Sequence, residues 1–171
     1  MVSYSSRNKV NELVKDFIAY RLRKAGYDNW GNGNLDSYSP TTEQRTLRLL
    51  GDEFESAYFD VFDDMTGTIN IYGADLKDAF TSIADAVFVN HNGGIQWGRI
   101  VGLFVLSAKL CVKAMDCNRP DIVDLIVIWT TDYLDDNRFS TWISQHGGWV
   151  SEVQVWAVPV CLNFNLENAL T

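Results

Sequence analysis

The sequence predicts an all-α globule of seven to eight helices arranged around one fully apolar helix. Apolar residues recur at three- and four-residue spacings along most of the chain, and no segment alternates convincingly like a β-strand. Hydrophobic residues make up 47% of the 171 residues and include six tryptophans, a composition far from that of a disordered chain. We therefore expect residues 1–171 to form a single domain with a substantial core.

Helix and loop signals are clear in the N-terminal part of the chain. Residues 7–25 place apolar side chains along one face and end at Gly26, a residue favoured just beyond a helix. Residues 28–40 are rich in glycine, asparagine, aspartate and serine, which predicts a loop. Thr41 or Thr42 is expected to cap the next helix. The apolar side of that helix carries Leu47, Leu50, Phe54, Tyr58 and Phe62.

The later elements follow the same pattern. A weaker turn is expected at 59–65 and a helix over 76–89. The stretch from Asn90 to Gly94 breaks that helix. The most apolar helix covers 95–114. Pro120, a good first-turn residue, opens a helix that runs to about residue 135, and two short helices follow around 139–145 and 149–157.

No segment is predicted to span a bilayer, because a membrane helix needs about 20 apolar residues. The best candidate, Ile100 to Val112, is shorter and contains Lys109, so we expect a buried core helix there. The stretch from Val153 to Leu166 is apolar but is interrupted by Pro159 and two asparagines.

Composition and motifs argue against several functional classes. A net charge of −8 disfavours nucleic acid as a partner. The two histidines, His91 and His146, lie in no metal-binding spacing, His146 is expected in an exposed turn, and no motif for phosphate binding or nucleophilic catalysis occurs. We expect no active site, cofactor or metal. The three cysteines, Cys111, Cys117 and Cys161, are unpatterned, and with no signal peptide they predict reduced thiols in an intracellular protein.

The most informative stretches are Gln96-Trp-Gly-Arg99 and Trp142-Ile-Ser-Gln-His-Gly-Gly-Trp149. Arg99 stands directly before nine uncharged residues, Ile100 to Ala108. An unpaired buried charge is costly, so we expect Arg99 at the lip of an apolar surface, where a carboxylate from elsewhere can pair with it.

Three glycines in the same region, Gly94, Gly98 and Gly102, are spaced by four and are expected near one face of the helix. Glycine inside a helix costs about 1 kcal/mol relative to alanine, so these positions need a steric reason. One interpretation is tight packing between helices of the core. The other is room for a bound helix. The neighbouring Arg99, taken together with the family resemblance of these motifs, favours this second interpretation.

Four motifs in order closely resemble the homology motifs of the B-cell lymphoma two (Bcl-2) family of apoptosis regulators. Glu12 to Leu22 with Gly26-Tyr27 is similar to the fourth motif, and Leu47-Arg-Leu-Leu-Gly-Asp-Glu-Phe54 to the third. Gln96 to Val112 and Trp142 to Trp149 are similar to the first and second. The resemblance implies a helical domain with a surface groove that binds the amphipathic third-motif helix of other family members.

Carried over by residue, the resemblance implies a groove built by the helices of 42–114 and closed by the helices of 120–157. One wall is expected to contain Phe54, Tyr58 and Phe62, and the opposite wall Val87 and Phe88. The ligand-binding set is completed by Met65, Gln96, Gly98, Arg99, Val101, Gly102, Leu106 and Trp156. Arg99 is expected to pair with the ligand's aspartate through two hydrogen bonds, with Gln96 bonding beside it and Val101, Gly102 and Leu106 as the floor.

The residue types alone leave an alternative open for the aromatic positions. For Phe54, Tyr58 and Phe62 groove and ordinary core are equally favoured, whereas Trp97, Trp129, Trp142 and Trp149 are expected in the core. The chain departs from the family at Gln96, where asparagine is usual, at Trp156, where tyrosine is common, and at Glu43, which replaces an apolar anchor. Glu43 argues against export of the chain's own third motif, which consists of Leu47, Leu50, Gly51, Asp52 and Phe54.

Two functions of the family compete. The fourth motif and the Gly51-Asp52-Glu53-Phe54 sequence favour a survival protein that sequesters third-motif helices. The alternative is a pro-apoptotic effector that unfolds onto the outer mitochondrial membrane and forms pores; Ser107 to Leu110 and Trp129 to Leu134 resemble effectors.

The resemblance also implies partners and a location. We expect pro-apoptotic family members as protein partners, including heterodimers with effectors, in the cytoplasm and at the surface of the outer mitochondrial membrane or the endoplasmic reticulum. The chain stops at Thr171, so we expect that the hydrophobic membrane tail of many family members is either absent or trimmed.

Overall fold

A computed structural model describes residues 4–31, 39–88 and 94–151, and every regular element in this part of the chain is a helix, which confirms the all-α prediction. The elements are α1 (Tyr4–Lys24), α2 (Thr42–Ala57), α3 (Phe59–Gly67), α4 (Leu76–Phe88), α5 (Trp97–Asp116), α6 (Pro120–Leu134), α7 (Asn137–Gln145) and α8 (Gly148–Ser151). None of the helices in these ranges combines the length and apolar character that crossing a bilayer requires. The expected helix over 149–157 lies largely outside the described residues.

Local signals fix several helix ends. Beyond α1, Gly26 adopts a φ of +93°, which glycine reaches without strain, and Tyr27 donates its N–H to the carbonyl of Leu22 at 2.9 Å. At the start of α2, Thr41 accepts the N–H of Gln44 at 3.3 Å, and the Gln44 side chain accepts the N–H of Thr41 at 2.8 Å. Thr41, one of the two expected residues, is therefore the cap.

Two elements differ from the sequence prediction. The expected weak turn at 59–65 is a nine-residue helix, α3, which Tyr58 alone separates from α2. The central helix begins at Trp97, so Gly94 lies outside it, with a left-handed φ of +63°. The prediction that Gly94, Gly98 and Gly102 share one helical face is thus wrong for Gly94, because the backbone there has not yet entered the helix.

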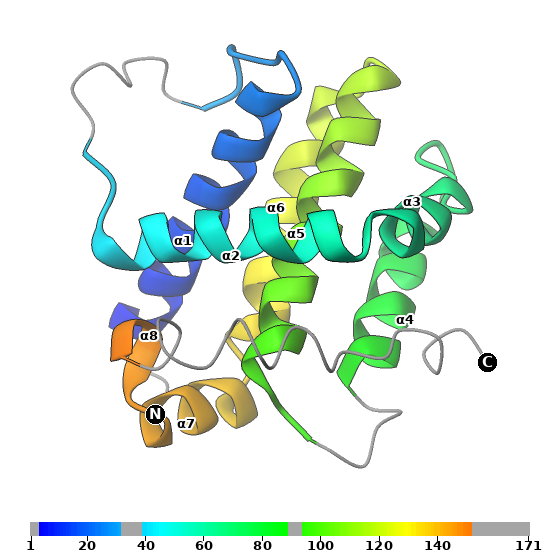
Figure 1. Ribbon diagram of the computed structural model, residues 1–171. Coiled ribbons are helices and arrows are strands. Elements are labelled where there is room, and N and C mark those ends of the chain that lie inside the picture. The colour runs from blue at the N-terminus through cyan, green and yellow to red at the C-terminus, as the bar shows by residue number, and fades with distance from the viewer. Residues whose placement is uncertain (1–3, 32–38, 89–93, 152–171) are drawn as a thin grey trace.

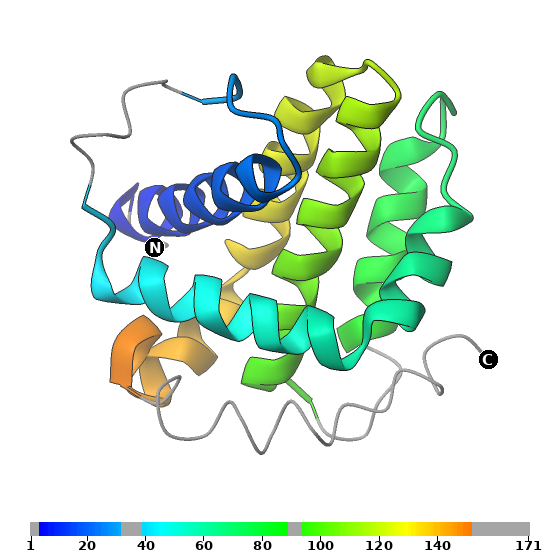
Figure 2. The ribbon, with the colours of Figure 1, turned by 45° about the horizontal axis from the view of Figure 1, so that its top comes forward.

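The core is centred on α5, which contacts α1, α2, α3, α4 and α6. Figure 1 shows α2 crossing in front of α5, and Figure 2 shows α1 on one side of α5 and the α3–α4 pair on the other. Ile100, Leu103 and Leu106 of α5 have no exposed surface. The rings of Phe17 and Phe104 meet edge to face at 5.6 Å, joining α1 to α5.

Aromatic side chains fasten the start of α5 to α7 and α8. Trp97 is buried, and its ring centroid lies 5.3 Å from that of Trp142 and 5.7 Å from that of Trp149. Trp97 is thus a core residue as expected, whereas Trp142 and Trp149 are half-buried and pack against the core. His146 was expected in an exposed turn, but it is half-buried, because it is the C-cap of α7. Its ring stacks on that of Trp142, with the two ring centroids 4.1 Å apart.

Candidate functional site

The first turn of α5 positions Arg99. Gln96 is the N-cap, with an extended backbone (φ −143°, ψ 150°), and its carbonyl accepts the N–H groups of Arg99 and Ile100 at 3.1 and 3.2 Å. Gly98 follows Trp97 in this turn and is buried. The hydrogen bonds of Gln96 therefore fix the backbone of the first turn, from which the Arg99 side chain extends.

Arg99 lies deeper than the sequence analysis predicts. Only 7% of the residue is exposed, so its expected position at the lip of the surface is wrong. The Nη1 group donates to the carbonyl oxygen of Gly94 at 2.7 Å, which the left-handed turn at Gly94 brings back over the helix start. Burial lowers the pKa of Arg99 below its ordinary value, because desolvation disfavours the charged form. Within the described residues, no carboxylate forms an ion pair with Arg99 to offset this desolvation.

The residues of the first expected wall lie together around the junction of α2 and α3. The Phe54 ring lies 5.0 Å from that of Tyr58 and 5.5 Å from that of Phe62. Phe54, Phe62 and Met65 are at most 4% exposed, whereas Tyr58 is half-buried. This wall is therefore packed into the core in the structure, and its role in ligand binding stays a prediction.

The residues of the opposite wall lie at the end of α4. Val87 is buried, and the ring of Phe88 lies 4.8 Å from Phe139 of α7 and 5.8 Å from Tyr133 of α6. Tyr133 in turn donates its hydroxyl to Asp85 of α4 at 2.8 Å. The ring contacts of Phe88 are thus with the closing helices rather than with α3.

The expected floor lies along α5. Val101, Gly102 and Leu106 are all buried, with 1% of Val101 and none of Leu106 exposed. Trp156, assigned to the end of the groove, lies outside the described residues. The role of Val101, Gly102 and Leu106 as the floor of a groove stays a prediction.

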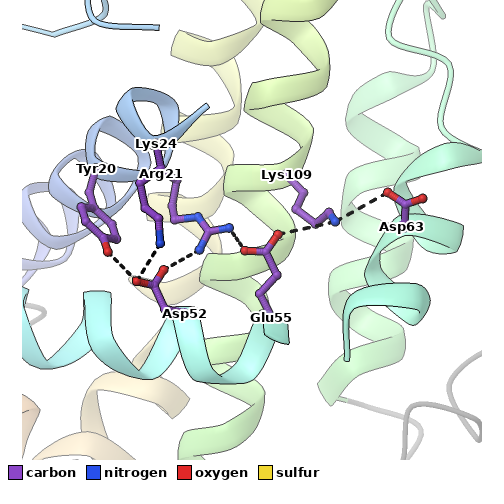
Figure 3. Close-up of polar contacts among 7 residues, drawn as sticks. All are labelled: Tyr20, Arg21, Lys24, Asp52, Glu55, Asp63 and Lys109. Atoms are coloured by element: carbon purple, nitrogen blue, oxygen red, sulfur yellow. Dashed lines mark hydrogen bonds and ion pairs between the residues drawn. The ribbon is translucent and has the colours of Figure 1, made fainter. Parts of the chain in front are cut away.

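The chain's own third motif is held inside the bundle. Leu47, Leu50 and Phe54 are buried. Figure 3 shows how α1 holds the motif's aspartate: Asp52 accepts hydrogen bonds from Tyr20 at 2.5 Å, Arg21 at 2.6 Å and Lys24 at 3.0 Å. Because its apolar residues are buried and its carboxylate is bonded to α1, α2 is a structural helix in this structure and not a displayed ligand.

Sequence reasoning missed the polar connections around α3. Lys109 entered the sequence prediction as an argument against a membrane span and as part of the effector-like stretch Ser107 to Leu110, and Lys113 was not singled out. Both line a cleft of about 510 Å³ between α1, α2, α3 and α5, and Lys109 lies close to Glu55 and Asp63 there. A second pocket of about 310 Å³ lies between α4 and α6 around Trp129. The residues assigned to the groove line neither of these two pockets. The spacing of Lys109 and Lys113, four residues apart on the largely apolar α5, was the available signal.

Residues 47–149 match the family model described as "Apoptosis regulator proteins, Bcl-2 family". Bcl-2-like protein 1 of Gallus gallus is 34% identical over 113 residues, 66% of this chain and 48% of that protein. The Homo sapiens protein of the same name is 33% identical, over 66% of this chain and 47% of that protein. Apoptosis regulator Bcl-2 of Cricetulus griseus is 30% identical over 121 residues, 71% of this chain and 50% of that protein. The chain thus spans about half the length of the curated relatives it matches.

Proposed function

Since the chain belongs to the Bcl-2 family of apoptosis regulators, we propose that it is a survival protein that binds the third-motif helices of pro-apoptotic relatives in a groove beside α5. Its partners in this proposal are those relatives, including pore-forming effectors. We also propose that it meets them inside the cell, at the surface of the outer mitochondrial membrane or the endoplasmic reticulum. Its activity is binding and not catalysis.

The observation that carries the proposal is the state of Arg99. An arginine whose residue is only 7% exposed, in an apolar helix, normally has a carboxylate partner, because desolvating an unpaired charge is costly. Here its hydrogen bond within the described residues goes to one backbone carbonyl. A ligand aspartate would supply the missing charge, and guanidinium and carboxylate can form two parallel hydrogen bonds.

The apolar residues assigned to the groove suit the remainder of such a ligand. An amphipathic helix presents anchors at i, i+3 or i+4, and i+7, which fill apolar pockets along a groove. Phe54, Phe62, Val101 and Leu106 offer large apolar surfaces from α2, α3 and α5. Since they are buried in the structure, the proposal includes an opening step that exposes them to the ligand.

Titration calorimetry with a panel of third-motif peptides tests the binding step. We expect a complex of one peptide per chain, with the peptide becoming helical by circular dichroism. A matched peptide whose aspartate is replaced by alanine serves as the control and should bind more weakly. Failure of every peptide in a broad panel to bind would remove the groove proposal.

Dye release from liposomes tests the direction of the activity. A survival protein should block the release that an added effector causes and should cause none by itself. Dye release by the chain alone, promoted by third-motif peptides, would instead establish the pore-forming alternative.

A further inference from the structure

Two lysines of α5 hold α3 against the central helix. Lys113 donates from its ammonium group to three backbone carbonyls at the end of α3, those of Thr66 at 2.7 Å, Gly67 at 3.2 Å and Ile69 at 2.6 Å. The last carbonyls of a helix lack partners within the helix, and a cation there also interacts favourably with the helix dipole. A single side chain therefore closes the C-terminal end of α3 onto α5.

Lys109, one turn earlier on the same face of α5, contacts the other half of α3. Its ammonium group lies 3.6 Å from a carboxylate oxygen of Asp63 and 3.5 Å from one of Glu55, and 4.4 Å from the ring centre of Phe59. Figure 3 shows Lys109 extended between Glu55 of α2 and Asp63 of α3. Together the two lysines connect α5 to both ends of α3.

Along the chain, a single residue connects α3 to α2. Tyr58 is at once the C-cap of α2 and the N-cap of α3, with φ −125° and ψ 29°, and α3 starts without a side-chain capping hydrogen bond. A nine-residue helix has little stability by itself, so its position depends on tertiary contacts. Movement of α3 away from α5 could pivot at Tyr58, but only after the contacts of Lys113 and Lys109 break.

This movement matters for the proposed groove because α3 carries Phe62 and Met65, which are 1% and 4% exposed. We propose that Lys113, assisted by Lys109, is the positioning residue that keeps α3 closed and thereby sets the affinity for a ligand helix. The inference rests on the proposed function. When only a fraction of molecules is open, the apparent Kd equals the intrinsic Kd divided by that fraction. Weakening the closed state should therefore tighten ligand binding.

The test is Lys113→Met, which keeps the length of the side chain and removes its donors. We expect it to lower the melting temperature and yet to bind a third-motif peptide about tenfold more tightly, equivalent to about 1.4 kcal/mol. Hydrogen exchange should show faster exchange of the amides of residues 59–67. Lys113→Arg retains donors for the carbonyls and should bind as wild type does. Lys109→Met should also tighten peptide binding. If Lys113→Met does not fold, the peptide affinity of Lys109→Met tests the proposal in its place.

Arg48→Met is the matched control. Arg48 grips Asp16 through two hydrogen bonds, at 2.9 and 2.6 Å, and joins α1 to α2 without touching α3. It should also lower the melting temperature but leave peptide affinity unchanged. Unchanged or weaker binding by Lys113→Met, with wild type binding normally, would overturn this inference alone. Absence of binding by wild type would instead overturn the proposed function, and this inference with it.

Discussion

Asp52 illustrates how one side chain of the third motif serves the fold. Burial opposes ionisation of this carboxyl, but hydrogen bonds from Tyr20 and Lys24 and the charges of Lys24 and Arg21 outweigh burial and hold the pKa of Asp52 below its ordinary value. Arg21 also forms an ion pair with Glu55, one turn further along α2. Hydrogen bonds and ion pairs of charged groups therefore join the C-terminal end of α1 to the C-terminal half of α2.

The pKa shift predicts a specific pH dependence for Asp52→Asn. A carboxyl whose pKa is lower in the folded state stabilises the fold above its unfolded pKa of about 3.9, and this stabilisation disappears as pH falls through the folded value. We expect the variant to be about 1–3 kcal/mol less stable at pH 7, the cost of lost hydrogen bonds to a charged group. Urea unfolding at pH 7 and at successively lower pH should show the difference shrinking below about pH 4. If the stability difference between wild type and Asp52→Asn stayed constant across this pH range, the lowered pKa of Asp52 would be contradicted.

Gly51, the neighbouring residue of the motif, allows α1 and α2 to approach closely. A Cβ atom at this position would lie 2.4 Å from two atoms of the Phe17 ring, which is fully buried against Phe104 and cannot move aside easily. Gly51→Ala should therefore destabilise the fold by about 1–3 kcal/mol through overpacking. Gly67→Ala is the control, since a Cβ atom there meets nothing within 4 Å. Equal unfolding free energies of the two variants would show that the close approach has no energetic consequence.

At the scale of a helix, the start of α2 has a local cause that can be tested. Thr41 and Gln44 satisfy each other's backbone N–H groups, and such a capping residue contributes about 1 kcal/mol. Thr41→Ala should lower the unfolding free energy in urea by about that amount, while Thr41→Ser should restore most of it. Full stability of the alanine variant would mean that α2 is fixed by packing alone.

Helix ends with such local signals could be predicted from the sequence, as Gly26, Thr41 and Pro120 show. The helix α3 could not, because its residues carry a weak local pattern and its position depends on lysines almost fifty residues later in the chain. The depth of Arg99 was also unpredictable, since it depends on how the turn at Gly94 folds back over α5. Periodicity thus predicted the bundle, whereas tertiary hydrogen bonds decide the geometry of the candidate site.

At the scale of the molecule, α5 carries a buried cation in its first turn and packs against apolar side chains from several helices. Arg99 enters from the start of α5, and Phe54 and Phe62 come from α2 and α3, which also contact α5. These residues are distant in sequence and become neighbours of one helix only in the folded chain. In the proposed function, binding therefore depends on the whole arrangement, and its electrostatic specificity depends on Arg99.

A double-mutant cycle between Arg99 and the aspartate of a third-motif peptide tests this claim most directly. Titration calorimetry would give the binding free energy of wild type and Arg99→Ala with the native peptide and with its alanine variant. If the two charges pair in a desolvated groove, each single change should cost about 2–5 kcal/mol, and the coupling energy should be at least about 2 kcal/mol. Additive effects of the two changes, with Arg99→Ala folded normally, would show that Arg99 does not pair with the ligand and would contradict the account.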